Sequence, residues 1–315
     1  MVWITDAKLV AAVSEAGGAG ILGLNAGSTD ITTDPVETAE RLREQIREIR
    51  KLTSKLLDVN TFMGAQLDPF SAETYRIVLE EKVPFVLMLP FGNDNYGNGT
   101  GFDMELINKL KKAGIKIVYC PMTPTVKGML ETEKFVDVLI YTGSEAGGHN
   151  TEYNISLLSV FPYIRKAIKA PLMAAGGICE ELAAKAVAAM GAEGVYVGTR
   201  FMATTECRIH DSMKQKMIEA EASEMFKVPS MPGHIHLMPN VIGLEIKKMY
   251  AAGATGSEIN RYYKEFDGID TVMMATGGKP CNAITQTLDS LGIPYPVDDE
   301  MEVLNAREKP SRGSY

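Results

Sequence analysis

The chain has 315 residues, and 32 Lys and Arg against 40 Asp and Glu give a formal net charge of −8 at pH 7. This length allows one large α/β domain or two smaller ones, and the acidic balance gives no sign of nucleic-acid binding. No apolar run approaches the roughly 20 residues that cross a bilayer. We therefore expect no membrane partner. The four cysteines have no spacing typical of a zinc site, so we expect reduced thiols in a cytoplasmic protein.

Amphipathic helical patterns and short apolar runs alternate along the first 200 residues. Asp34-Pro35, for example, is a typical helix start: an aspartate cap followed by a proline at the first helical position. Predicted helices span 5–16, 34–52, 71–81, 103–113, 125–132, 155–168 and 180–190. Predicted strands span 20–24, 56–61, 85–89, 115–120, 136–141, 172–175 and 194–197.

Apolar runs without polar alternation are typical of strands buried on both faces of a parallel sheet. Seven such strands with helical crossovers favour a closed (β/α)8 TIM-type barrel, and an open doubly wound sheet is the alternative. A barrel needs one more strand, so the first strand is short or missing. Either Met1 to Ile4 is a stunted strand, or the natural protein begins about 15–25 residues earlier, enough for a strand and its lead-in.

The pattern changes after residue 203, which we take as the end of the barrel (1–203). Residues 204–270 show helical patterns without a buried strand, and they include a Pro-, Gly- and His-bearing loop at 229–239. We expect them to form a helical insertion or lid. Residues 271–315 are expected to return to the barrel rim and to end in a polar tail.

Three apolar runs in series are followed by glycines, and these glycines predict a ligand site. A glycine after a strand lets the backbone approach a ligand, and free amide N–H groups favour an anion. The last strand ends of a barrel are a known position for a phosphate site. We therefore predict phosphate binding there, with plain strand-to-helix turns as the alternative; the residues are Gly176, Gly177, Gly198 and Thr199.

His149 follows Gly147-Gly148, and we predict that it lies at the active face of the barrel. A neutral imidazole there can take a proton from a substrate carbon or stabilise negative charge on oxygen; a helix-capping role is the alternative. Glu145 either orients this imidazole or is a surface carboxylate. Cys120, at a strand tip, is explained more simply as a packed thiol. His234 and His236 form a pair without a third ligand, so we expect no metal.

Four motifs in order resemble the nitronate monooxygenase family, formerly called 2-nitropropane dioxygenase. Bacterial enoyl-acyl-carrier-protein reductase II is a close relative with nearly the same motifs. The resemblance covers residues 1 to about 201, is faint across the insertion and returns near Thr271. The motifs are SEAGGAGILG (14–23), EAGGH (145–149), AAGGI (174–178) and GVYVGTRF (194–201).

The resemblance implies a barrel that binds FMN. Asn60 resembles the family's flavin-contacting asparagine, and His149 its active-site histidine. Met1 stands where the family has a methionine after two glycines, which are absent here. The cofactor-binding residues implied in this way are Met1, Asn60, Glu145, Gly147, Gly148, Gly176, Gly177, Gly198 and Thr199.

For activity, the resemblance implies an oxidoreductase that oxidises alkyl nitronates with O2. One alternative is a flavoenzyme that reduces an enoyl thioester with NAD(P)H as co-substrate. Another is a non-catalytic flavin-binding barrel, motivated by the short first strand. The expected partner is a small-molecule substrate, a nitronate or an enoyl thioester, and a homodimer is the assembly considered.

Overall fold

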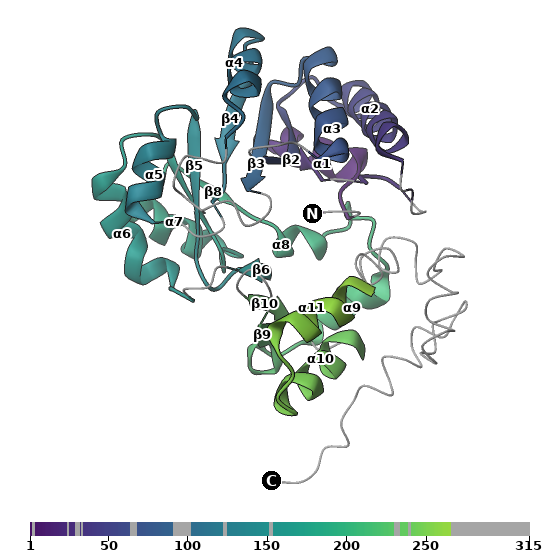
Figure 1. The fold of residues 1–315 in the computed structure, drawn as a ribbon, viewed down its shortest axis with the longest axis vertical. Helices are drawn as coiled ribbons and strands as arrows, with labels where there is room; N and C mark the ends of the chain where they lie inside the picture. The colour runs from purple at the N-terminus through teal and green to yellow at the C-terminus, as the bar shows by residue number, and fades with distance from the viewer. Residues whose placement is uncertain are drawn as a thin grey trace.

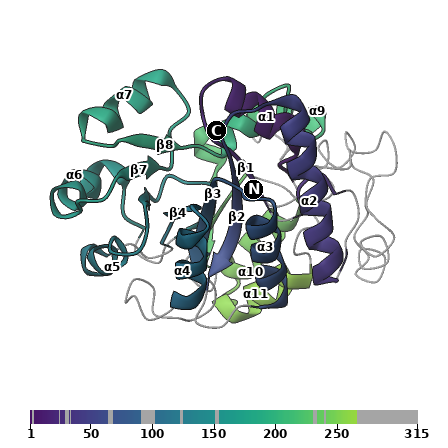
Figure 2. The same ribbon diagram turned by 90° about the horizontal axis from the view of Figure 1, so that it is seen from above.

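The computed structural model describes residues 1, 4–23, 25–28, 32, 34–63, 68–90, 102–121, 125–150, 154–229, 234–238 and 241–265. Within them, a curled parallel sheet carries helices on its outer side (Figures 1 and 2), with the strand order β1-β2-β3-β4-β5-β7-β8. The strands are β1 Gly20–Leu22, β2 Leu57–Met63, β3 Phe85–Pro90, β4 Lys116–Tyr119, β5 Val138–Thr142, β7 Leu172–Ala175 and β8 Gly194–Tyr196.

Several helices begin where the sequence supplies a capping side chain, and α2 and α4 are examples. Asp34 accepts the backbone N–H groups of Val36 and Glu37, and Asp103 accepts that of Leu106. The helices are α1 Ala7–Glu15, α2 Pro35–Leu52, α3 Pro69–Glu80, α4 Met104–Lys112, α5 Val126–Thr132, α6 Leu157–Ala167, α7 Glu181–Ala189 and α8 Thr199–Met202. Among the described helices, none combines the length and the apolar character that a membrane span requires.

Both faces of the sheet are apolar, which is why its strands lack polar alternation. On the outer face, Val59 and Leu139 belong to the large core formed with the helices. The concave face forms a second cluster of buried residues, which are Leu87, Val118, Cys120, Ile140 and Ala175. Six partly buried hydrophobic residues pack against this cluster; they are Ile21, Phe85, Leu89, Val138, Met173 and Tyr196.

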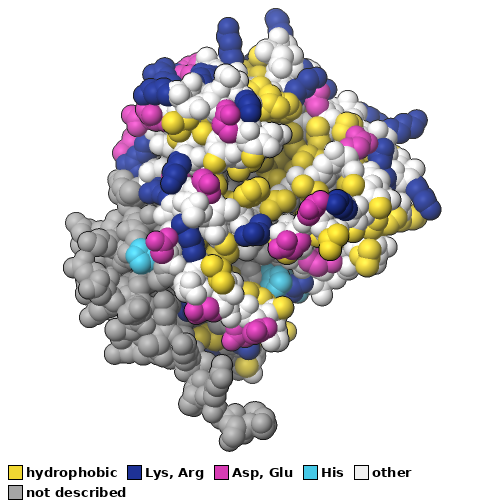
Figure 3. Space-filling model, turned by 180° about the vertical axis from the view of Figure 1, so that it is seen from behind, with side chains coloured by type: hydrophobic (Ala, Val, Ile, Leu, Met, Phe, Trp, Pro, Cys, Tyr) yellow, Lys and Arg dark blue, Asp and Glu magenta, His cyan; other side chains and the backbone are white. Residues whose placement is uncertain are grey.

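The seven predicted strands are confirmed, with ends that differ by up to two residues. In the described part of the chain, β1 and β8 are edge strands that pair on one side only. The sheet is therefore curled but open, and the predicted closed (β/α)8 barrel is not shown. From behind, hydrophobic side chains gather in a hollow of the surface (Figure 3).

The described part of the segment after the sheet contains four helical elements, α9 Asp211–Glu219, η1 Ala222–Glu224, α10 Val241–Ala251 and α11 Gly256–Glu265. It also contains two strands, β9 Phe226–Pro229 and β10 His234–Leu237. β10 pairs antiparallel with β9 and with β6 (Gly148–Asn150), so a second sheet forms. The predicted loop at 229–239 is therefore wrong for 234–237, and the insertion is not purely helical. The predicted return to the barrel over 271–315 lies outside the described residues.

Asp58 is a buried carboxylic acid in β2, opposite Ile21 and Phe85 of the neighbouring strands. It is 3% exposed, and its Oδ1 has no hydrogen-bond partner among the described residues. Burial raises the pKa of Asp58 from 3.8 to about 7, against the lowering effect of the Leu87 and Val59 backbone amides. The unfolded chain ionises first, so stability falls as the pH rises from about 4 through 7.

We expect Asp58→Asn to raise the free energy of unfolding at pH 8 by about 4 kcal/mol, and by much less at pH 4. The physical reason is that the amide removes the cost of ionising a buried group. Urea unfolding at the two pH values measures this difference. Asp211→Asn is the control, because the Asp211 side chain is 94% exposed. An equal effect of Asp58→Asn at both pH values would contradict the raised pKa.

Candidate functional site

The carboxyl ends of β5, β7 and β8 lie together at one edge of the sheet. The Gly143 N–H donates to the Ala175 carbonyl oxygen at 2.9 Å, which ties the tip of β5 to that of β7. A Cβ on Gly176 would lie 3.0 Å from the Gly143 carbonyl oxygen and 3.1 Å from the Ala146 nitrogen. Gly176 also has a φ of +102°, so this close approach requires glycine.

The loop after β5 contacts the two glycine-bearing strand ends that follow. A Cβ on Gly177 would lie 3.0 Å from Glu145 Cβ, and a Cβ on Gly147 would lie 3.0 Å from Thr199 Oγ1. Met1 reaches the same place, because its Sδ lies 3.9 Å from the position of a Cβ on Gly198. The structure thus brings together most of the predicted site. We call this group the strand-tip cluster: Met1, Glu145, Gly147, Gly176, Gly177, Gly198 and Thr199.

Gly198 has no steric need to be glycine in the described structure. Its φ is −119°, and the Met1 sulfur at 3.9 Å is an ordinary van der Waals contact. At the neighbouring strand end, Glu180 precedes α7 and provides no side-chain cap within the described residues. Gly198 therefore leaves its backbone open to a ligand, and in the described structure the first turn of α7 has backbone N–H groups without a side-chain acceptor. Both features suit a bound anion, which accepts hydrogen bonds from backbone N–H groups.

The Glu145 carboxylate caps α6. It accepts the Ser156 hydroxyl at 2.6 Å, and the Leu157 N–H lies 3.1 Å from each of its oxygens. Negative charge at a helix N-terminus is stabilising. The carboxylate is therefore engaged by α6, and Glu145 contacts Gly177 of the strand-tip cluster through its Cβ and Cγ atoms.

Two further residues of the predicted site, His149 and Asn60, lie within strands. His149 belongs to β6 of the second sheet, where its backbone is opposite Ile235, and not to the tip of a strand of the parallel sheet. Its side chain lies outside the described part of the structure. Asn60 is buried in the middle of β2, opposite Leu87, and β2 continues to Met63. Asn60 is therefore three residues short of the carboxyl end of its strand.

Cys120 is a packed thiol, as the sequence indicated. It is 7% exposed, and its Sγ lies 3.4 Å from Thr142 Oγ1. Burial raises the pKa of Cys120 to about 11, although the Thr142 contact lowers it somewhat. The thiol therefore stays protonated near neutral pH and is a poor nucleophile.

We expect iodoacetamide at pH 7.5 to label Cys179, which is exposed, about 100-fold faster than Cys120. The reason is that Cys120 is both shielded and protonated. Peptide mapping by mass spectrometry after timed quenching measures the two rates. Equal labelling of both cysteines in the folded protein would show that Cys120 is accessible as a thiolate.

Sequence reasoning missed two side chains that contact the site loop. Lys227 Nζ donates to the Ser144 carbonyl oxygen at 2.6 Å, and His236 Nδ1 lies 3.1 Å from the Ala146 carbonyl oxygen. The sequence analysis considered His236 only as a metal ligand, which it did not expect, because the loop that His236 contacts is distant in the chain. Within the described residues, no group of three or more His, Cys, Asp or Glu is placed to hold a metal ion.

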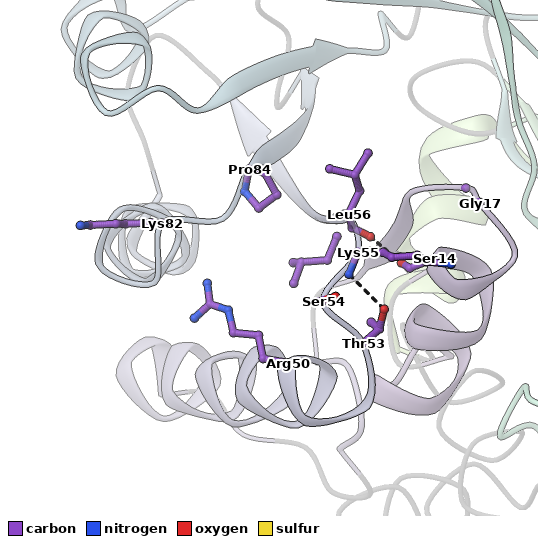
Figure 4. A pocket seen from close by; sticks show the side chains of 11 residues that line it. Ser14, Gly17, Arg50, Thr53, Ser54, Lys55, Leu56, Lys82 and Pro84 are labelled. Carbon is purple, nitrogen blue, oxygen red and sulfur yellow. Dashed lines mark hydrogen bonds between the residues drawn. The ribbon is translucent and has the colours of Figure 1, made fainter.

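A separate pocket of about 570 Å³ opens at the amino ends of β2 and β3, next to Leu57 and Pro84 (Figure 4). Two of its three basic lining residues already have acidic partners: Arg50 Nη1 lies 2.7 Å from Glu81 Oε2, and Lys55 Nζ lies 3.2 Å from Glu15 Oε2. The pocket lies at the edge opposite the strand-tip cluster. We therefore place the candidate site at the cluster.

A curled parallel sheet with outer helices and a site at the strands' carboxyl edge defines a TIM-barrel-like α/β protein. The chain belongs to the nitronate monooxygenase family, whose model matches residues 1–234. This match confirms the family that the four motifs predicted.

Relatives of the chain carry different names. A probable nitronate monooxygenase from Bacillus subtilis is 27% identical over 249 residues, covering 70% of this chain and 69% of that protein. A hydroxy-methyl-oxo-octahydro-indene-carboxyl-CoA dehydrogenase from Rhodococcus jostii is 29% identical over 247 residues, covering 75% of this chain and 60% of that protein. The structure of FabK from Thermotoga maritima matches with a TM-score of 0.70 at 25% identity, covering 98% of this chain and 90% of that one. Family membership alone therefore does not fix the substrate.

Proposed function

We propose that this protein is an FMN-dependent oxidoreductase that oxidises alkyl nitronates with O2. The observation that carries the proposal is the strand-tip cluster, where, among the described residues, Gly198 is glycine without a steric need and α7 begins without a side-chain cap. Both features fit a phosphate group that is met by backbone N–H groups. Membership in the nitronate monooxygenase family supports FMN as its carrier.

The residues present fit this cofactor. Backbone amides of the two strand tips and the Thr199 hydroxyl would hold the phosphate. Met1 would lie against the ring system, and the buried Asn60 amide would offer it hydrogen bonds from the concave face. Bound FMN supplies the two-electron redox chemistry. The phosphate-binding residues would be Gly176, Gly177, Gly198 and Thr199.

The chain itself binds, orients and shields the substrate. An imidazole N–H of His149 would donate to the nitronate oxygens and stabilise their negative charge. Leu87 and Ile140, buried on the concave face, would keep water from the reacting carbon.

Anaerobic mixing tests the proposal. Bleaching of the flavin absorbance by propyl-2-nitronate alone is the expected result. Bleaching by NADPH or NADH, and not by the nitronate, would instead indicate a thioester reductase. This activity is the second candidate because the name of the Rhodococcus relative includes a CoA thioester. If the protein takes up no flavin when reconstituted with FMN, both activities are contradicted.

A further inference from the structure

We infer that Lys227 and His236, in the insertion, are positioning residues for the loop at 144–150. This loop carries Gly147, Gly148 and His149 to the site. The inference rests on the proposed function for the identity of the ligand, but its structural basis is independent. In the structure, the insertion holds the loop by two side chains and by one strand pairing.

Lys227 closes the loop at its base. Its Nζ donates to the Ser144 carbonyl oxygen at 2.6 Å and to Asn154 Oδ1 at 2.7 Å. The two acceptors lie at the start and at the end of the segment that connects β5 to α6. The Ser144 N–H also donates to the Ile155 carbonyl oxygen at 2.9 Å, which holds these two ends together. An ammonium group has three donors, and its hydrogen bonds are stronger than neutral ones. One side chain therefore fixes where the loop leaves the sheet and where it returns.

His236 holds the middle of the loop. Its Nδ1 lies 3.1 Å from the Ala146 carbonyl oxygen, which can only accept, so Nδ1 carries the proton. The Asn150 side-chain amide donates to the same oxygen at 2.6 Å, so both acceptor positions of this carbonyl are used. The next residue is Gly147, which faces Thr199 Oγ1 in the strand-tip cluster. A shift of Ala146 would therefore change the cluster directly.

The strand that presents His236 also pairs with the strand that carries His149. In the pairing of β10 with β6, Gly148 is opposite His236, His149 is opposite Ile235 and Asn150 is opposite His234. The conformation of the loop is therefore set by the insertion and not by the parallel sheet alone. Lys227 and His236 lie behind the loop and contact its carbonyl groups, so they act on the site through loop position.

The test compares Lys227→Met with Lys247→Met, a matched control in the same insertion. Lys247 Nζ lies over the Phe226 ring, 5.1 Å from its centroid, and has no contact with the loop in the described structure. Hydrogen–deuterium exchange of the FMN-free protein reports on the 144–150 amides. We expect about tenfold faster exchange there in Lys227→Met and an about tenfold higher Kd for FMN, and no change in Lys247→Met. Lys227→Arg, which keeps charged donors, should recover both values.

His236→Leu is the second variant, in case Lys227→Met does not fold. It should also speed exchange over 144–150 and raise the Kd for FMN. Unchanged exchange in the folded variants, or Lys227→Arg behaving like Lys227→Met, would overturn the inference. If the wild type binds no FMN, the proposed function fails, but the exchange comparison still decides whether these two residues fix the loop.

Discussion

Gly198→Val is expected to lose FMN while keeping its fold. Without a ligand, a Cβ at this position meets, among the described residues, only the Met1 sulfur at an ordinary 3.9 Å, and the φ of −119° lies outside the left-handed region. With FMN bound, the branched side chain would occupy the space through which the backbone reaches the phosphate. Loss of one or two charge-assisted hydrogen bonds predicts an about 100-fold weaker Kd for FMN. Fluorescence titration measures the Kd, and thermal unfolding of the FMN-free protein measures the fold.

Gly114→Val is the matched control with the opposite expected outcome. Gly114 has a φ of +78° and no atom of the described structure near a built Cβ, and it precedes β4 at the far edge of the sheet. A valine there strains the backbone by about 1–3 kcal/mol, so stability should fall while FMN binding persists. A Gly198→Val protein that purifies with one FMN per chain would contradict the assignment of the strand-tip cluster as the phosphate-binding site.

His149→Ala is expected to keep FMN and to lower kcat/KM for propyl-2-nitronate by about 100-fold or more. The reason is that the nitronate oxygens would lose the imidazole N–H donor that stabilises their negative charge. Oxygen consumption at several nitronate concentrations gives kcat/KM, and the flavin absorbance gives the occupancy. His210→Ala is the control, because His210 is exposed beside α9. Turnover near the wild-type value with FMN bound would remove His149 from the mechanism.

Much of the sheet could be predicted because its information is local. The strands are apolar runs, and helix starts such as Asp34-Pro35 carry their own caps. The strand-tip cluster followed from one further rule, that the carboxyl ends of parallel strands meet at one edge. That rule places Gly176, Gly177 and Gly198 together without any knowledge of side-chain packing.

The errors arose where the structure depends on distant partners. β6 has three residues, and it is a strand only because β10 pairs with it from the insertion. The second strand was predicted to end at residue 61, but β2 runs on through Phe62 and Met63. For Glu145 the sequence left open a partner for His149 or a surface carboxylate, whereas in the structure α6 begins without a cap of its own and takes that carboxylate. Lys227 carried no local signal at all.

The most direct test of the account is the affinity of the FMN-free protein for FMN compared with riboflavin. The two ligands share the ring system and differ in the phosphate, so the ratio of their Kd values isolates the strand-tip cluster. We predict that FMN binds at least about 100-fold more tightly than riboflavin, because backbone N–H groups at the strand tips meet the phosphate. Equal affinities for the two ligands, or no binding of either, would contradict the account.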